Sequence, residues 1–270
     1  GLSAVLAIIS LLRIVTGVDD LSSSGTIRAT LIAAIPIGLA GLGGLWSERS
    51  GVVNIGLEGM MILGTFGAGY FGYFYGPWQG VFGAILLGAA GGLLHAVATV
   101  YFGVDHIVSG VAINIIALGA VQYLAALAFT GVPGGGQTQS PPIGQLPSIT
   151  ISWLSDPLGE IESQNWFFIS DAAALLRAMV TNISVLTIIS LGLFVLTWWL
   201  LWRTSFGLRV RSCGESPAAA ESLGINVYRY KFIAVITSGG LAGLAGGCVA
   251  LVAATAFRDG QTGGRGYIGL

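Results

Sequence analysis

The sequence predicts an all-α fold, a polytopic transmembrane helix bundle. Hydrophobic residues make up 54% of the 270 residues and charged residues only 9%, whereas soluble domains carry about a quarter charged residues. Long apolar runs recur along the chain, and glycine accounts for 43 residues, which suits helices that approach closely in lipid. The net charge is −1, which gives no reason to expect nucleic acid as a partner.

Seven apolar segments are long enough to cross a bilayer if the shorter ones are tilted or packed in protein. They lie at about 1–17, 27–46, 57–76, 78–101, 107–130, 183–202 and 231–256. The loop Arg203–Lys231 contains five of the eleven basic residues, and the positive-inside rule therefore places it in the cytoplasm. Alternation then puts 47–56 and 102–106 inside and 131–182 outside.

The whole chain, 1–270, is expected to form one transmembrane domain. Its parts are a first group of spans (1–130), an external loop with a short surface helix (131–182), a span (183–202), a cytoplasmic loop (203–231) and the start of a second repeat (231–270). The stretch PGGGQTQSPP should be irregular. Asp171 before AAALLRAMV predicts a capped helix at the membrane surface. The external loop could be a docking surface or a solvated connector.

Two short motifs each occur twice in the sequence, which indicates inverted repeats. GLAGL occurs at 38–42 and 240–244, and IGL at 55–57 and 268–270, with an insertion expected around Arg258–Gly264. The first copy would run toward the cytoplasm and the second away from it, which is typical of transporters with a site between the halves. Chance similarity in a chain rich in Gly, Ala and Leu is the alternative. If the repeat is real, the second half is incomplete and further spans belong beyond Leu270.

Two polar clusters lie at or inside the membrane, where polar groups are costly unless they face a cavity or a partner. The first is WSERSGVVNIGLEGMM, in which Glu58 follows Asn54 by one helical turn, so that both could line a substrate path. The alternative is a structural turn in which Asn54 caps the next helix. The second cluster holds Ser109 and Asn114, and Asn114 could contact substrate or form an interhelical bond. Four residues, Asn54, Glu58, Ser109 and Asn114, are therefore the candidate substrate pathway.

No catalytic or metal site is predicted. The chain has no GxxxxGK[ST] loop to hold ATP phosphates and no HExxH. The two cysteines, Cys213 and Cys248, lack metal-ligand spacing. We expect no enzyme activity and no cofactor bound by this chain.

The cytoplasmic loop predicts one short helix. Ser216 is a suitable N-cap, Pro217 suits the first helical position, and Gly224 suits the stop. A helix over 217–223 is too short to be stable alone in water. It must pack on the bundle or on a partner.

Two motifs resemble one family of transport proteins. FGLRVRSCGESPAAAESLGINVYRYKFIAVITSGGLAGLAGG is similar to the cytoplasmic coupling region of permease subunits of ABC importers for branched-chain amino acids, simple sugars and nucleosides. SERSGVVNIGLEGMM resembles the early motif of the same family, in the form of the nucleoside (BMP-type) branch. The resemblance covers most of 27–270. The acidic insertion around 153–182 and the ending at Leu270 depart from the family pattern.

The resemblance implies a multi-pass subunit of the bacterial inner membrane that moves nucleosides. Its implied partners are cytosolic subunits that use ATP and Mg²⁺, a second permease subunit (a copy or a homologue) and an extracytoplasmic substrate-binding lipoprotein. The residues implied to couple to the ATPase are Gly214, Glu215, Ser216, Pro217, Ala218, Ala219, Ala220 and Glu221. The alternatives are an ABC permease for sugar or branched-chain amino acid, an ion-gradient-driven secondary transporter, and a structural membrane scaffold.

Overall fold

The computed structural model describes residues 2–18, 23–164 and 166–270, and these residues are mostly α-helical. Within them the strands are β1 (Ser148–Ile149) and β2 (Ile183–Ser184), which pair antiparallel. The predicted all-α bundle is confirmed. The chain divides into two compact units, one formed by the chain up to Ala34 with Pro147–Ile188 and the other by Ile35–Leu146 with Ile189–Leu270.

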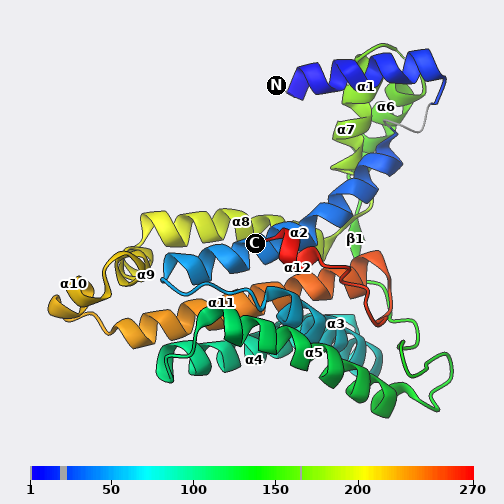
Figure 1. The fold of residues 1–270 in the computed structure, drawn as a ribbon. Helices are drawn as coiled ribbons and strands as arrows, with labels where there is room; N and C mark the ends of the chain where they lie inside the picture. Colours follow the sequence, from blue (N-terminus) through cyan, green and yellow to red (C-terminus); the bar gives the residue numbers. More distant parts are fainter. Residues whose placement is uncertain (1, 19–22, 165) are drawn as a thin grey trace. The chain divides into compact units, whose positions relative to one another are not determined.

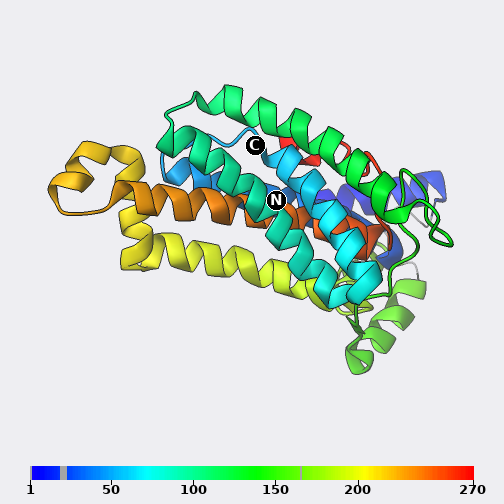
Figure 2. The same cartoon turned by 90° about the horizontal axis from the view of Figure 1, so that it is seen from below.

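The larger unit holds most of the apolar helices. They are α2 (Ser24–Arg49, here from Ile35), α3 (Leu57–Tyr75), α4 (Pro77–Ala96) with the π-helix η2 (Val97–Tyr101), α5 (His106–Phe129), α8 (Val185–Arg203, here from Ile189), α9 (Ser205–Glu215), α10 (Pro217–Ser222), α11 (Val227–Cys248) with the π-helix η3 (Val249–Ala253), and α12 (Arg265–Ile268). Helices α3, α4 and α11 form the centre (Figures 1 and 2).

Five helices of the described residues are long and apolar enough to cross a membrane, namely 24–49, 77–101, 106–129, 185–203 and 227–253. They match five of the seven predicted spans to within a few residues. The predicted span 57–76 is helix α3, which is continuous, largely buried and rich in glycine. The predicted span 1–17 is α1 (Leu2–Thr16), a shorter apolar helix.

Glycine allows the central helices to touch through their backbones. A Cβ atom on Gly64 of α3 would overlap the backbone of Gly243 in α11, and a Cβ on Gly88 of α4 would overlap Gly239 and Gly243. Side chains larger than hydrogen would separate these helices. GAAGG (88–92) and GGLAGLAGG (239–247) are therefore packing motifs, as expected where van der Waals contact drives helix association in lipid.

Helices α2 and α11 run in opposite directions (Figures 1 and 2). They carry the two GLAGL copies, and they cross where Gly43 packs against the backbone of Ser238. Each is followed by a non-helical break, at 50–56 and at 254–264, and then by a new helix. An inverted repeat would have this arrangement, and the repeat stays a prediction.

The cytoplasmic loop is more helical than predicted. Helix α10 (Pro217–Ser222) agrees with the predicted helix, and Gly224 takes the left-handed conformation (φ 79°) that ends it. Ser216 occupies the N-cap position, but its side chain makes no capping hydrogen bond. Helix α9, which precedes α10, was not expected. A small buried cluster of Cys213, Ala220 and Val227 holds α10 to its neighbours.

The smaller unit consists of α1, the start of α2, the β1–β2 pair, α6 (Ser152–Ser163) and α7 (Ile169–Ala178). Residues 133–142 contain no helix, as predicted. Asp171 is not the N-cap of α7. The helix begins at Ile169, and Asp171 lies buried in its first turn, paired with Arg13. An ionic partner, rather than the helix start, determines its position.

Candidate functional site

The break between α2 and α3 is the most polar part of the larger unit's interior. Gly51 (φ 83°) ends α2, and the chain continues without helix to Gly56. Val52 and Asn54 in this segment are buried. Backbone N–H and C=O groups that lack helical partners within a membrane must be satisfied by other groups. The surrounding helices supply those groups through side chains.

Asn54 connects the break to the second repeat. Its Nδ2 donates a hydrogen bond to Ser238 Oγ of α11 (2.9 Å), and its Oδ1 accepts one from the backbone N–H of Gly56 (3.1 Å). Asn54 lies before α3, whose N-cap is Gly56. The predicted helical turn from Asn54 to Glu58 is therefore wrong, and so is the alternative in which Asn54 caps the helix.

Asn114 of α5 closes the other side of the break. Its Oδ1 accepts a hydrogen bond from the N–H of Gly59 (2.7 Å), and its Nδ2 donates to the carbonyl of Ile55 (3.0 Å). Gly59 must lack a side chain, because a Cβ there would meet Asn114 at 2.8 Å. Of the two uses left open for Asn114, the structure shows the interhelical bond.

Ser109 is connected to the break through His95. His95 of α4 is fully buried, and its ring nitrogens bond to Ser109 Oγ (2.9 Å) and to the carbonyl of Val53 (3.2 Å). Since a carbonyl oxygen only accepts, Nε2 carries the proton and Nδ1 accepts from the Ser109 hydroxyl. His106 Nδ1 accepts a longer bond from the Val53 N–H (3.3 Å). Both polar groups of Val53 are thus satisfied.

Glu58 joins the start of α3 to the second break. Its Oε1 accepts hydrogen bonds from Thr262 Oγ1 (2.6 Å) and the Gly264 N–H (3.1 Å), and its Oε2 accepts one from the Gly266 N–H (2.7 Å). The side chain is 5% exposed. It lies in the first turn of α3, where the helix dipole favours negative charge. The carboxylate therefore fixes the second break, which lies about 200 residues away in the sequence.

The four predicted pathway residues are thus brought together around one segment, 50–59. Their polar atoms hold backbone and side-chain groups of the chain itself. Sequence reasoning missed two members of this group. Ser238 gave no signal within its glycine-rich run, and the bond that brings His95 into the group is made to Ser109, 14 residues away.

The predicted coupling segment, 214–221, lies against the start of the same break. Gly214 lies against the backbone of Arg49 and Gly51 so closely that a Cβ there would meet the Arg49 carbonyl at 2.5 Å. Residues 215–219 and Glu221 are exposed, while Ala220 is buried. A pocket beneath α10 is lined by residues of the break, η2, α5, α10 and α11. They are Val52, Thr99, Val100, His106, Pro217, Glu221, Val227, Tyr228 and Lys231. The exposed face of α10 and the break are therefore neighbours.

Comparison with known proteins assigns the family. The family described as "Branched-chain amino acid transport system / permease component" matches residues 26–264. The guanosine ABC transporter permease protein NupQ of Bacillus subtilis is 39% identical over 251 residues, which cover 90% of this chain and 72% of the relative. The nucleoside ABC transporter permease protein NupC of Lactococcus lactis is 34% identical, with 89% and 71% covered.

A putative glucose ABC transporter permease protein, TsgC13 of Haloferax volcanii, is 30% identical, with 92% of this chain and 69% of the relative covered. No solved structure matches the chain. The resemblance to importer permeases seen in the coupling and early motifs is confirmed. The chain belongs to the family of branched-chain amino acid transport permease components, and it is a multi-pass transport subunit of the bacterial plasma membrane.

Proposed function

We propose that this chain is the permease subunit of an ABC importer and forms the membrane path for nucleosides. The observation that carries the proposal is the pair of opposed helices, α2 and α11, each broken inside the bundle and joined through Glu58. Broken helices at the interface of inverted repeats are where transporters bind their substrates. The nucleoside class rests on the two relatives named as guanosine and nucleoside permeases.

The same proposal assigns the partners. Two cytosolic ATP-binding subunits bind the exposed side of α10, with Gly214–Glu221 as the coupling segment. A second permease subunit completes the membrane core, and an extracytoplasmic substrate-binding lipoprotein delivers the nucleoside. Support comes from the exposure of α10 and from the contact of Gly214 with the α2–α3 break, which links the docking surface to the path. The chain contributes no phosphate-binding loop, so ATP and Mg²⁺ belong to the partner subunits.

The roles of the pathway residues follow from their contacts. Asn54, Glu58, Ser109 and Asn114 shape the path by holding the backbone of the break in one conformation. A side chain that already makes two or three hydrogen bonds has little capacity left for a ligand. Substrate contact therefore falls to the surfaces that these residues position.

Uptake into proteoliposomes tests the assignment. The chain is reconstituted with its partner permease, ATP-binding subunits and binding protein, and uptake of labelled guanosine is measured with and without ATP. We expect ATP-dependent uptake that unlabelled adenosine reduces and that glucose and leucine leave unchanged. Glucose uptake in place of guanosine would favour the sugar class of the Haloferax volcanii relative. Uptake driven by an ion gradient without the ATPase would contradict the ABC mechanism.

A further inference from the structure

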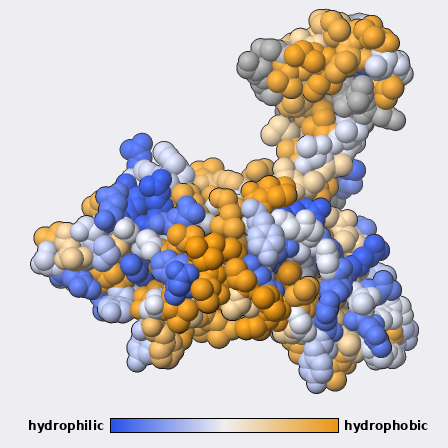
Figure 3. Space-filling view, in the orientation of Figure 1, coloured by the Kyte–Doolittle hydropathy of each residue, from blue (hydrophilic) through white to orange (hydrophobic). Residues whose placement is uncertain are grey.

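The smaller unit buries several polar side chains beside its apolar ones, and one side of it exposes large apolar side chains. Its buried polar residues are Ser10, Arg13, Ser155, Ser170 and Asp171. The large apolar side chains of α1 and α7 are about half or more exposed: Val5, Ile8, Leu11, Leu12, Ile14, Val15, Ile169 and Leu176. A domain surrounded by water shows the opposite arrangement. Figure 3 shows the hydrophobic surface over α1.

A buried ion pair organises this interior. Arg13 Nη2 of α1 lies 3.5 Å from Asp171 Oδ2 of α7, and the two side chains are 5% and 0% exposed. Arg13 also donates to the carbonyl of Trp166 (3.3 Å), and Ser10 Oγ accepts from the N–H of Phe168 (2.8 Å). The polar side chains Ser10 and Arg13 of α1 are thus bonded to α7 and to the residues just before it. Among its described residues, α1 otherwise exposes apolar side chains, apart from Thr16 at its end.

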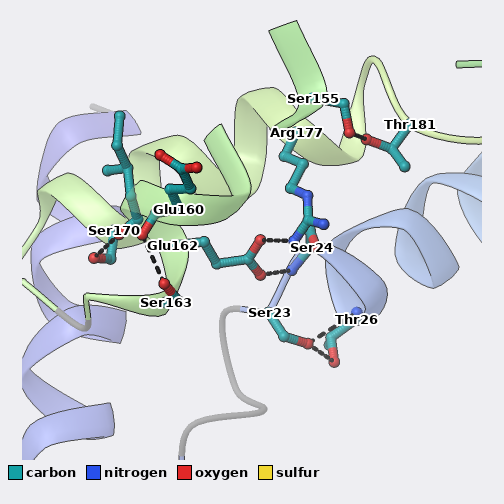
Figure 4. Close-up of polar contacts among 11 residues, drawn as sticks. Ser23, Ser24, Thr26, Ser155, Glu160, Glu162, Ser163, Ser170, Arg177 and Thr181 are labelled. Atoms are coloured by element: carbon teal, nitrogen blue, oxygen red, sulfur yellow. Dashed lines mark hydrogen bonds and ion pairs between the residues drawn. The ribbon is translucent and has the colours of Figure 1, made fainter. Parts of the chain in front are cut away.

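The opposite side of the unit is hydrophilic. Helix α6 exposes Asp156, Glu160 and Ser163. Glu162, on the same helix, accepts a hydrogen bond from the backbone N–H of Ser24 (2.8 Å) and one from Arg177 Nη1 (2.7 Å), which ties α6 to α2 and α7 (Figure 4). The unit therefore has one apolar side and one acidic side.

We propose that the exposed apolar surface of α1 and α7, the "α1–α7 surface", is in contact with the hydrocarbon of the bilayer, while α6 faces the water outside. Three observations point to lipid as the occupant. The surface includes that of α1, an apolar helix of a multi-pass membrane protein. The charged groups Arg13 and Asp171 behind it are buried and paired with each other, as charges in lipid must be. Trp153 and Trp166 are exposed at the ends of α6 and α7, as at a membrane interface.

The proposal places α7 deeper in the membrane than the surface position that the sequence predicted. A surface helix would keep its polar face toward water, but in α7 Asp171 pairs with Arg13 of α1, and Ser170 and Arg177 bond to α6. The acidic exposed residues of α6 also argue against attraction to anionic headgroups. Contact should therefore depend on the hydrocarbon and not on lipid charge.

Site-directed spin labelling tests the α1–α7 surface directly. In the full chain, with buried Cys213 and Cys248 replaced by alanine, single cysteines are placed at Leu176 and Met179 and, as matched controls, at Asp156 and Glu160. After reconstitution in liposomes, the accessibility of each label to oxygen, which dissolves in lipid, is compared with its accessibility to a water-soluble nickel chelate. We expect several-fold more oxygen than nickel relaxation at 176 and 179, and the reverse at 156 and 160.

Two results would overturn the proposal. Nickel access at 176 and 179 equal to that at 156 and 160 would place the surface in water. Exclusion of both reagents at 176 and 179 would show that another protein covers it. Liposomes with and without anionic lipid should give the same ratios, and a ratio that changes with lipid charge would contradict a purely apolar contact.

The ion pair supplies a second measurement. Arg13→Ala leaves the Asp171 carboxylate buried and uncompensated, so we expect nickel access at 176 to rise several-fold as α7 separates from α1. The double variant Arg13→Ala/Asp171→Ala should restore low access. Equal nickel access in all three proteins would show that the pair does not hold α7 at its depth.

Discussion

Replacing Glu58 by glutamine is the change that the structure predicts to be most damaging for its size. The carboxylate accepts hydrogen bonds from Thr262, Gly264 and Gly266, all in or just after the second break. Glutamine has nearly the same shape, but it carries no charge and one of its two oxygens becomes an NH₂ donor. That donor would face an N–H or O–H group that also donates.

The magnitude follows from the three bonds. A hydrogen bond to a charged group contributes about 1.5–3 kcal/mol. If Glu58→Gln loses two of the three at the lower end of this range, the conformation that joins the breaks is destabilised by about 3 kcal/mol, which corresponds to on the order of 100-fold in its population. Thr262→Val removes a single bond and should cost about 1.5 kcal/mol.

Uptake, ATP hydrolysis and stability in detergent should be measured together. We expect Glu58→Gln to reduce ATP-dependent uptake by on the order of 100-fold and to shorten the half-life of thermal inactivation, with Thr262→Val intermediate. Glu48→Gln, at the exposed end of α2, is the matched control and should behave like the unmodified protein. Uptake by Glu58→Gln within a factor of about two of the unmodified protein would refute the reasoning, because a change that small corresponds to less than about 0.5 kcal/mol.

Three further predictions concern packing, coupling and pH. Gly64→Ala should destabilise the bundle by at least about 1–3 kcal/mol, because its Cβ would overlap the backbone of Gly243, whereas Gly119→Ala, with open space around it, should be neutral in the same thermal assay. Ala219→Pro should disrupt α10, and uptake should fall while the ATPase subunits keep hydrolysing; unchanged uptake would remove α10 from the coupling role. Burial raises the pKa of Glu162, but the hydrogen bonds of Figure 4 outweigh it and hold that pKa below its ordinary value. The stabilisation that the Glu162 carboxylate gives the folded state is therefore present above its pKa in the unfolded chain, about 4.3, and is lost as pH falls through its lower pKa in the folded chain. Melting curves of Glu162→Gln and of the unmodified protein should therefore converge on acidification.

The helices were predictable because their determinants are local. Long apolar runs define α4, α5, α8 and α11 to within a few residues. Pro217 and Gly224 mark the two ends of α10 through fixed backbone preferences. Each of these signals can be recognised within one short window of sequence.

The site was only partly predictable, because its partners are distant in the sequence. Asn54 and Glu58 stood out as polar residues in an apolar region, but their bonds to Ser238 and Thr262 span 184 and 204 residues. The repeated GLAGL motif carried the information about these distant partners. It implied that the second repeat has its own break, and a break paired with the first would have placed 262–266 beside Glu58.

Two local rules failed for a physical reason. The Asp171 pattern is typical of an N-cap, yet the side chain is withdrawn into the unit by Arg13. Asn54 and Glu58 are four residues apart, which suggests one helical face, yet the helix does not begin until Leu57. In both cases a tertiary hydrogen bond or ion pair outweighed the local preference.

The contacts around the break constrain how it moves during transport. Val53 and Asn54 are bonded to α4 and α11, and Gly214 presses on the cytoplasmic side of the same segment. Unravelling the break would expose several backbone groups to lipid, each at a cost of several kcal/mol. We propose that a displacement of α10 would move the break as a rigid piece with its bonded side chains, and that Glu58 would carry this movement to the 262–266 segment. On this proposal the packing between the helices changes during transport, and the hydrogen bonds within the break stay made.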